Sequence, residues 1–251
     1  MSRIVAFANQ KGGVAKTTST LAMAVGLAER GRRVLAVDLD PQGALTYSMG
    51  VDPDTLDETI NDVLVRRLPI EKVIIDREVD VAPANIDLAG AEAVLLAKTG
   101  REFALQRALR DIEGAYDYIL IDCPPSLGIL TINGLTAANE VVIPVQTEAL
   151  SHRGVGQLIE TLGDIRHFTN PNLEVIGVMP TLFDGRSRHA QEVLADIGGR
   201  YNVRVLEPPV RKSIKFAEAS QAGRSILSYA STHPGAQAYR ELAAVVDGEV
   251  S

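Results

Sequence analysis

The chain has 251 residues, a net charge of −7 and a single cysteine. Hydrophobic residues make up 46% and charged residues 23%, which excludes a disordered or collagen-like chain. One cysteine cannot form an internal disulfide, no stretch approaches the ~18 apolar residues of a membrane span, and the N-terminus lacks the pattern of a signal peptide. We therefore expect a cytoplasmic protein that does not associate with membranes, and that binds nucleic acid only through a local basic patch.

Strand-like apolar runs alternate with helix-like segments along the chain. The expected strands are Ile4–Ala8, Val34–Val37, Tyr118–Ile121, Val141–Ile143 and Val175–Val178. The expected helices are Thr17–Arg30, Arg101–Ile112, Gly154–Phe168, Ala190–Ile197 and Gly235–Val246. This order predicts one α/β domain over residues 1–251, with a mostly parallel twisted sheet and helices on both faces. Ligands of such sheets bind at the carboxyl ends of the strands.

A glycine- and lysine-rich loop follows the first expected strand and precedes the first expected helix. Such a loop cradles phosphates with its backbone N–H groups and with the N-terminus of the helix behind it. Lys16 is expected to reach the β- and γ-phosphates, and the Thr17 hydroxyl to ligate Mg²⁺. The whole predicted phosphate loop consists of Lys11, Gly12, Gly13, Val14, Ala15, Lys16, Thr17 and Thr18. The sequence therefore predicts a nucleotide site.

This loop resembles the deviant Walker A motif, KGGxGKT, of the ParA/MinD group of P-loop ATPases. The segments Val37–Gly43 and Asp122–Gly128 are also similar to motifs of that group. Pro83–Glu92 and Phe216–Ala219 are similar specifically to ParA/Soj partition ATPases, and the chain resembles their short, chromosomal type. Ala15 stands where the family has glycine. Because alanine disfavours positive φ, we expect right-handed backbone there.

Three aspartates follow the expected strands at the predicted nucleotide edge. Asp38 and Asp122 each end a buried strand, where a carboxylate can hold Mg²⁺ through water. The resemblance implies that Asp40 positions the attacking water. It also implies that Lys11 crosses into the nucleotide site of a second subunit in an ATP-bound homodimer, where it acts as an arginine finger does. Gly12 would let the two backbones approach closely.

A basic region lies between Phe183 and Arg224, with eight basic and five acidic residues in a chain that is acidic overall. The resemblance implies weak, non-specific binding of double-stranded DNA by this region, with Arg186 and Lys215 at the best-matching positions. Spacing from the Glu218–Ala219 pair places Arg211 and Ser213 in the segment that contacts the adenine in the family. The prolines of this chain come earlier, at Pro208 and Pro209.

The resemblance implies an ATPase, stimulated by a ParB-like partner, that associates with the nucleoid and drives chromosome or plasmid partition. A related ATPase that positions a protein cargo, such as a carboxysome or a chemoreceptor array, fits the same residues. A MinD-like membrane cycle needs a basic amphipathic C-terminal helix, and it is disfavoured because the segment Val245–Ser251 is acidic. An iron–sulfur enzyme would need about four cysteine ligands. An ATP-dependent ligase on the same fold stays open, whereas Asp40 argues against a nucleotide-binding scaffold without turnover.

Overall fold

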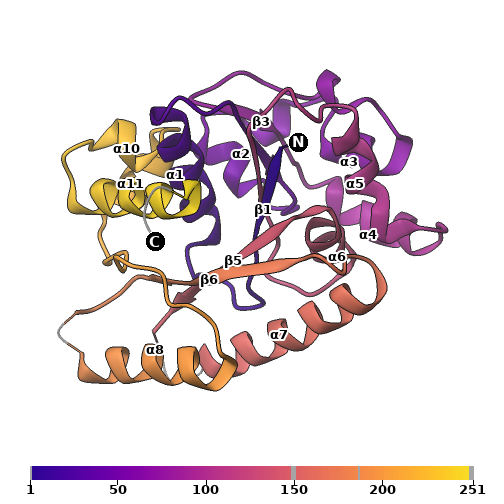
Figure 1. The fold of residues 1–251 in the computed structure, drawn as a ribbon. Helices are drawn as coiled ribbons and strands as arrows, with labels where there is room; N and C mark the ends of the chain where they lie inside the picture. The colour runs from indigo at the N-terminus through magenta and orange to yellow at the C-terminus, as the bar shows by residue number, and fades with distance from the viewer. Residues whose placement is uncertain (1, 148–150, 186, 249–251) are drawn as a thin grey trace.

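The computed structural model describes residues 2–147, 151–185 and 187–248. For residues 151–153 and 188–189 it describes the backbone only. All strands belong to one six-stranded parallel sheet with the order β3-β2-β4-β1-β5-β6 (Figure 1). The strands are β1 (Arg3–Phe7), β2 (Val34–Asp38), β3 (Asp80–Ala82), β4 (Tyr118–Asp122), β5 (Glu140–Gln146) and β6 (Glu174–Thr181). The predicted parallel sheet is confirmed.

The α-helices alternate with the strands in sequence. Before β4 they are α1 (Lys16–Glu29), α2 (Ala44–Ser48), α3 (Ile60–Arg66), α4 (Leu88–Leu96) and α5 (Ala104–Arg110). After β4 they are α6 (Ile129–Ala137), α7 (Ser151–Phe168), α8 (Arg188–Tyr201), α9 (Lys215–Gln221), α10 (Ile226–Tyr229) and α11 (Pro234–Asp247). Among the described residues, no helix is long and apolar enough to cross a membrane.

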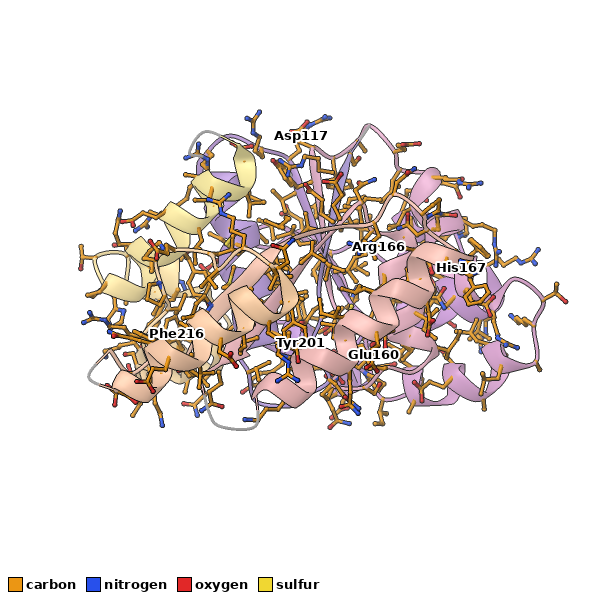
Figure 2. All side chains as sticks on the ribbon, turned by 60° about the horizontal axis from the view of Figure 1, so that its bottom comes forward. Asp117, Glu160, Arg166, His167, Tyr201 and Phe216 are labelled. Atoms are coloured by element: carbon orange, nitrogen blue, oxygen red, sulfur yellow. The ribbon has the colours of Figure 1, made fainter. Side chains whose placement is uncertain are left out.

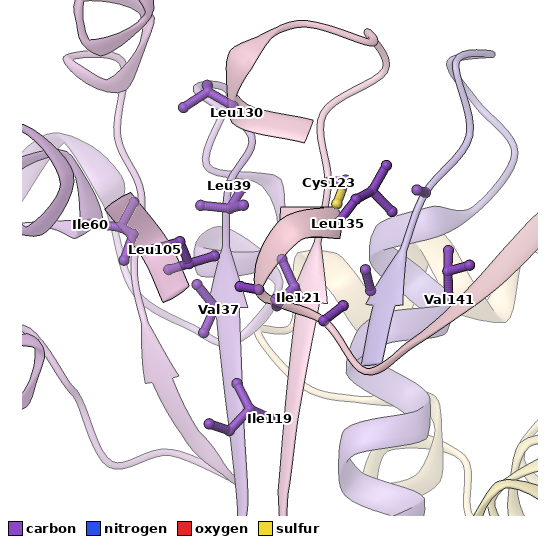
Figure 3. Close-up of a cluster of buried hydrophobic side chains, with 14 of the residues drawn as sticks. Val37, Leu39, Ile60, Leu105, Ile119, Ile121, Cys123, Leu130, Leu135 and Val141 are labelled. Atoms are coloured by element: carbon purple, nitrogen blue, oxygen red, sulfur yellow. The ribbon is translucent and has the colours of Figure 1, made fainter. Parts of the chain in front are cut away.

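Alternate residues of the central strands pack on opposite faces of the sheet, as the period of two dictates. On one face, Ile119 and Ile121 of β4 join a core cluster with residues from α3 to α8, part of which is shown in Figure 3. On the other face, Tyr118 and Leu120 join a cluster with residues from α1, α2 and α9 to α11. Both faces of the sheet are therefore covered. Figure 2 shows α7 and α8 side by side on one side of the molecule, with Glu160 and Tyr201 labelled on them.

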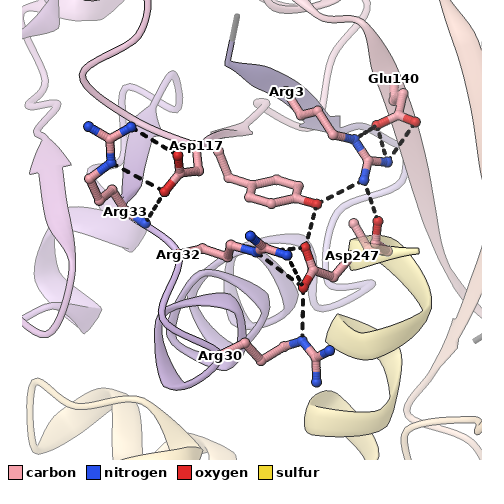
Figure 4. Close-up of polar contacts among 9 residues, drawn as sticks. Arg3, Arg30, Arg32, Arg33, Asp117, Glu140 and Asp247 are labelled. Carbon is pink, nitrogen blue, oxygen red and sulfur yellow. Dashed lines mark hydrogen bonds and ion pairs between the residues drawn. The ribbon is translucent and has the colours of Figure 1, made fainter. Parts of the chain in front are cut away.

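Charged residues gather at the amino ends of the strands, opposite the nucleotide edge (Figure 4). Arg3 donates to both carboxylate oxygens of Glu140 at 2.8 Å, which ties the start of β1 to the start of β5. Asp247, at the end of α11, accepts hydrogen bonds from Arg30, Arg32 and the Tyr118 hydroxyl. These contacts fasten the last helix to the base of the sheet.

Candidate phosphate-binding site

The predicted phosphate loop lies between β1 and α1, at the carboxyl edge of the sheet. Its main chain is held from two neighbouring strands. The Thr181 hydroxyl, at the end of β6, donates to the Val14 carbonyl at 2.9 Å. The Asn9 amide donates to the Pro144 carbonyl of β5 at 2.7 Å, and its oxygen accepts the Lys11 N–H at 3.0 Å. The loop is thus fixed by residues far apart in sequence.

The expectation for the Ala15 backbone is wrong. Ala15 is the N-cap of α1 and has φ 59° and ψ 35°, which is left-handed rather than right-handed. The turn from the loop into α1 demands this conformation, and Ala15 adopts it although an L side chain is disfavoured there by about 1 kcal/mol. Leu182, which follows β6, is also left-handed with φ 49°. Backbone strain of this kind is concentrated at functional sites.

Lys16, Thr17 and Asp122 come together at the start of α1. The Thr17 hydroxyl donates to Asp122 Oδ2 at 2.7 Å, and Thr20 donates to Oδ1 at 3.3 Å. The Lys16 ammonium is nearly buried and donates to the Lys11 carbonyl at 3.2 Å. Burial lowers the pKa of Lys16, although the charge of Asp122 opposes this shift. The lysine therefore places a poorly solvated positive charge on the loop.

Two carboxylates are fully buried below the loop. Burial raises the pKa of Asp122 to about 8, and the nearby charge of Asp38 adds to the rise. Burial also raises the pKa of Asp38 to about 6, while hydrogen bonds from Thr46 and Asp40 oppose it. Negative charge is thus poorly compensated here by the protein alone, and a cation would relieve it.

Asp38 organises the neighbouring loop. One of its oxygens accepts the Thr46 N–H at 2.9 Å and the Thr46 hydroxyl at 2.7 Å, and the other accepts the Asp40 N–H at 3.1 Å. Asp40 is half-buried, and its Oδ1 accepts the Gln42 N–H at 3.0 Å. The predicted residues Asp38, Asp40 and Asp122 therefore meet at one edge, with Asp38 fixing the backbone of Asp40.

The donor set fits Mg²⁺ bound together with a nucleotide. Within the part of the chain described, no group of three or more His, Cys, Asp or Glu residues could hold a metal by itself. Mg²⁺ at nucleotide sites needs few protein ligands, because phosphate oxygens and water complete its shell. The Thr17 hydroxyl and the Asp122 carboxylate, 2.7 Å apart, supply such a pair. Asp38 is also fully buried and stands opposite Asp122 on the neighbouring strand, where its carboxylate would contact the ion through water.

An open pocket of about 490 Å³ begins directly after β6, next to the residue that holds the phosphate loop. It is lined by Leu182, Phe183, Asp184, Gly185, Arg211 and Lys212. Its position and the presence of Arg211 make it the candidate for the nucleotide base. Ser213 does not line it; its hydroxyl lies 3.2 Å from His233 Nε2. Arg211 and Ser213 both line a second open pocket of about 420 Å³, together with Pro208, Pro209 and His233, so the two residues that spacing places together do lie in one pocket.

Two of the predicted residues, Lys11 and Gly12, lie at the outer surface of the loop. Lys11 is half-buried at the loop entrance. A Cβ added to Gly12 would lie 3.8 Å from Pro125 Cβ, an ordinary van der Waals distance, whereas Gly13 has φ 73° and needs its glycine for the turn. The fold itself therefore leaves room for a Cβ at Gly12.

One of the two predicted DNA residues, Lys215, lies within the described part of the chain. Lys215 begins α9, and its ammonium lies 2.6 Å from Glu218 Oε2. Arg186 lies outside the described residues. Phe216, which follows Lys215, is labelled in Figure 2 beside the yellow C-terminal helices. Cys123, the single cysteine, is buried.

Sequence reasoning missed the residues that hold the site in place. These residues are Thr46, Thr181 and Asn9, and none of them belongs to a recognised motif. Each holds the site through one or two side-chain hydrogen bonds. Thr181 and Asn9 do stand at the carboxyl ends of strands, which was the available signal.

Comparisons with known proteins agree with this geometry. A family model described as an AAA domain matches residues 2–175. The chain is 39% identical over 246 residues to the sporulation initiation inhibitor protein Soj of Bacillus subtilis, covering 97% of each protein. It is 39% identical over 245 residues to the chromosome partitioning protein ParA of Myxococcus xanthus, covering 96% of this chain and 87% of that one.

A solved structure is also similar over nearly the whole chain. It is described as cobyrinic acid a,c-diamide synthase from Mycobacterium smegmatis with bound ADP and magnesium. The TM-score is 0.88 and the identity 48%, covering 98% of this chain and 94% of that one. The phosphate loop with its two lysines and the carboxylates at the same sheet edge agree with what these relatives indicate. The chain belongs to the ParA/MinD family of P-loop ATPases.

Proposed function

We propose that this protein is an ATP-hydrolysing switch that dimerises around ATP, binds DNA without sequence preference and drives chromosome or plasmid partition with a ParB-like partner. The observation that carries the proposal is the pair of lysines, Lys11 and Lys16, on one loop that faces three carboxylates. A single lysine is enough to bind phosphates. The second one calls for a separate role.

ATP and Mg²⁺ are the ligands that the site fits, and the Mycobacterium smegmatis relative was solved with ADP and magnesium. The loop N–H groups and Lys16 would hold the phosphates, and Thr17 with Asp122 would hold the metal. When bound, Mg²⁺ neutralises charge on the phosphate oxygens. Binding also relieves the uncompensated negative charge of the buried carboxylates.

Asp40 is the residue proposed to orient the attacking water. Phosphoryl transfer needs positioning and charge neutralisation rather than covalent help, so one fixed carboxylate suffices. The chain fixes it in two steps, because Thr46 holds Asp38 and Asp38 holds the Asp40 N–H. Without Asp40, the site should still bind ATP.

Dimerisation gives Lys11 and Gly12 their roles. The fold has space for a Cβ at Gly12, so the need for glycine there is not intramolecular. If a second molecule approaches closely at Gly12, a side chain there would obstruct it, which explains the glycine. The same approach would bring the Lys11 of the second molecule to the phosphates. Gly12→Val should therefore fold normally and stay monomeric with ATP, which light scattering can measure.

Phosphate release with three variants tests the proposal. The wild type should hydrolyse ATP slowly, and faster with DNA and a ParB-like partner. Lys16→Ala should lose ATP binding by calorimetry, whereas Asp40→Ala should bind ATP normally and hydrolyse it at least ~100-fold more slowly. Lys11→Ala should bind ATP as a monomer. Wild-type turnover by Asp40→Ala would contradict the assigned chemistry.

The name of the Mycobacterium smegmatis relative raises a second candidate, the synthesis of cobyrinic acid a,c-diamide. The same phosphate-release assay separates the two. ATP consumption that requires cobyrinic acid and an amino donor, and that ignores DNA, would favour the synthase. Consumption stimulated by DNA and unaffected by cobyrinic acid would favour the partition switch.

A further inference from the structure

Ile214 is displayed to solvent at the edge of the basic region. Its side chain is 73% exposed, although it precedes a helix in which Phe216 packs against the core cluster. Isolated exposed aliphatic residues are ordinary, so exposure alone carries no function. The way in which the chain holds this residue does distinguish it.

The residues around Ile214 are anchored inward. Ser213 Oγ lies 3.2 Å from His233 Nε2 and accepts the Lys215 N–H at 3.2 Å. Phe216 stacks edge-on against the rings of His233 and Tyr239, with ring centroids 6.2 and 6.1 Å apart. These contacts fix the backbone on both sides of Ile214, so the side chain points outward from a rigid support.

That support is itself tied to the helix of the phosphate loop. Tyr239 is fully buried, and its hydroxyl lies 2.8 Å from the Ser19 hydroxyl of α1. A β-branched side chain on fixed backbone has little conformational freedom left to lose on binding. Ile214 is therefore ready to enter a partner at low entropic cost.

The charges beside Ile214 favour a polyanion as the partner. Arg211 and Lys212 are exposed on one side of it in the chain, and Lys215 follows directly on the other. An aliphatic side chain among cations fits a duplex, where phosphates flank a groove. Isoleucine is among the apolar residues that enter DNA grooves and press on base steps.

Resting on the proposed DNA binding, we propose that Ile214 enters a groove of duplex DNA between phosphates bound by Lys212 and Lys215. The contact adds an apolar component to an otherwise electrostatic interaction. Because no counterion is released by an apolar contact, its contribution is the same at every salt concentration. The charges, in contrast, set the slope of log K against log salt.

Fluorescence anisotropy of a labelled duplex with the full-length, ATP-bound protein separates the two components. Across a salt series, Ile214→Ala should bind roughly tenfold more weakly with no change of slope, since it removes three carbon groups that the DNA contact would partly bury. Ile214→Leu should restore most of the affinity. Lys215→Gln should lower the slope by about 0.9 for each phosphate that the variant no longer neutralises.

Leu96→Ala is the matched control, because Leu96 is an aliphatic residue 58% exposed on α4. It should bind DNA like the wild type. Equal affinity of Ile214→Ala and the wild type would overturn the inference while leaving the proposed function intact. Failure of the wild type itself to bind DNA with ATP would instead overturn the proposed function. A third outcome is that Ile214→Ala binds DNA like the wild type but binds anionic lipid vesicles more weakly than the wild type. This result would overturn the inference and assign Ile214 to a membrane surface.

Discussion

The Thr17 hydroxyl donates a hydrogen bond of 2.7 Å to Asp122, a carboxylate with no exposed surface. This contact joins the first turn of α1 to the end of β4. It also places the two proposed metal ligands side by side before any ion is bound. The arrangement is costly for the protein alone, because burial raises the pKa of Asp122 to about 8.

Asp122→Asn should stabilise the folded protein at the expense of Mg²⁺-dependent ATP binding. The folded pKa of Asp122 is raised above its unfolded value, so its contribution to stability is fully present below about pH 4 and is lost as the pH rises through about 8. Removing the charge should raise the free energy of unfolding at pH 8 by at least about 1 kcal/mol. Urea unfolding of the nucleotide-free protein measures this. ATP binding should lose its dependence on Mg²⁺, and an unchanged Mg²⁺ dependence would refute the assignment.

Ala15→Gly should stabilise the protein by about 0.5–1 kcal/mol, because glycine adopts the observed left-handed conformation without a steric penalty. Thermal unfolding measures the effect. Ala108→Gly, in the middle of α5, is the control and should destabilise by a similar amount. A loss of stability in both variants would mean that Ala15 is not strained.

Asp247→Asn should destabilise the protein at neutral pH and not in acid. Burial alone would raise the pKa of Asp247, but hydrogen bonds from Arg32, Tyr118 and Arg30 outweigh it and lower the pKa. The stabilisation is therefore present above the unfolded pKa of about 4 and is lost as the pH falls through the folded value. Because both arginines are partly exposed, we expect the variant to be less stable by about 1–2 kcal/mol at pH 7.

Urea midpoints of the wild type and Asp247→Asn should converge as the pH falls below about 4. Asp117→Asn is a suitable control, since its ion pair with Arg33 is exposed on both sides and should change the midpoint much less. A difference between wild type and Asp247→Asn that persists at low pH would show that the contact does not depend on charge.

Glu218→Gln should strengthen DNA binding. The Lys215 ammonium lies 2.6 Å from Glu218, which also accepts a hydrogen bond from the Tyr229 hydroxyl. A phosphate must compete with this carboxylate for Lys215. Removing the charge should raise the affinity roughly two- to fivefold and steepen the salt dependence. Weaker binding would mean that Glu218 orients Lys215 rather than restraining it.

The sequence predicted five of the six strands and the place of the phosphate loop between β1 and α1 because their signals are local. Buried strands are continuous apolar runs, and the phosphate loop is a contiguous motif. The sequence did not predict β3, because this strand has only three residues, Asp80–Ala82, and lies at the edge of the sheet. Helix α4 is apolar on nearly all sides, so it shows little of the periodicity that reveals a helix.

The conformation of Ala15 could not be read from residue type, because tertiary contacts overrode a local preference. The Val14 carbonyl is fixed by Thr181, a residue 167 positions away in sequence. Ser213 was placed by spacing alone, and its contact with His233, the N-cap of the last helix, holds it in a pocket that it shares with Arg211. Such contacts exist only in the folded chain.

The most direct test of the account is the salt dependence of duplex binding by Asp40→Ala, measured with ATP and with ADP. If ATP joins two molecules so that two basic regions face the DNA, the phosphate contacts double. The slope of log K against log salt, roughly 0.9 for each phosphate, should then be about twice as steep with ATP as with ADP. Equal slopes and equal affinities with the two nucleotides would contradict an ATP-controlled DNA switch.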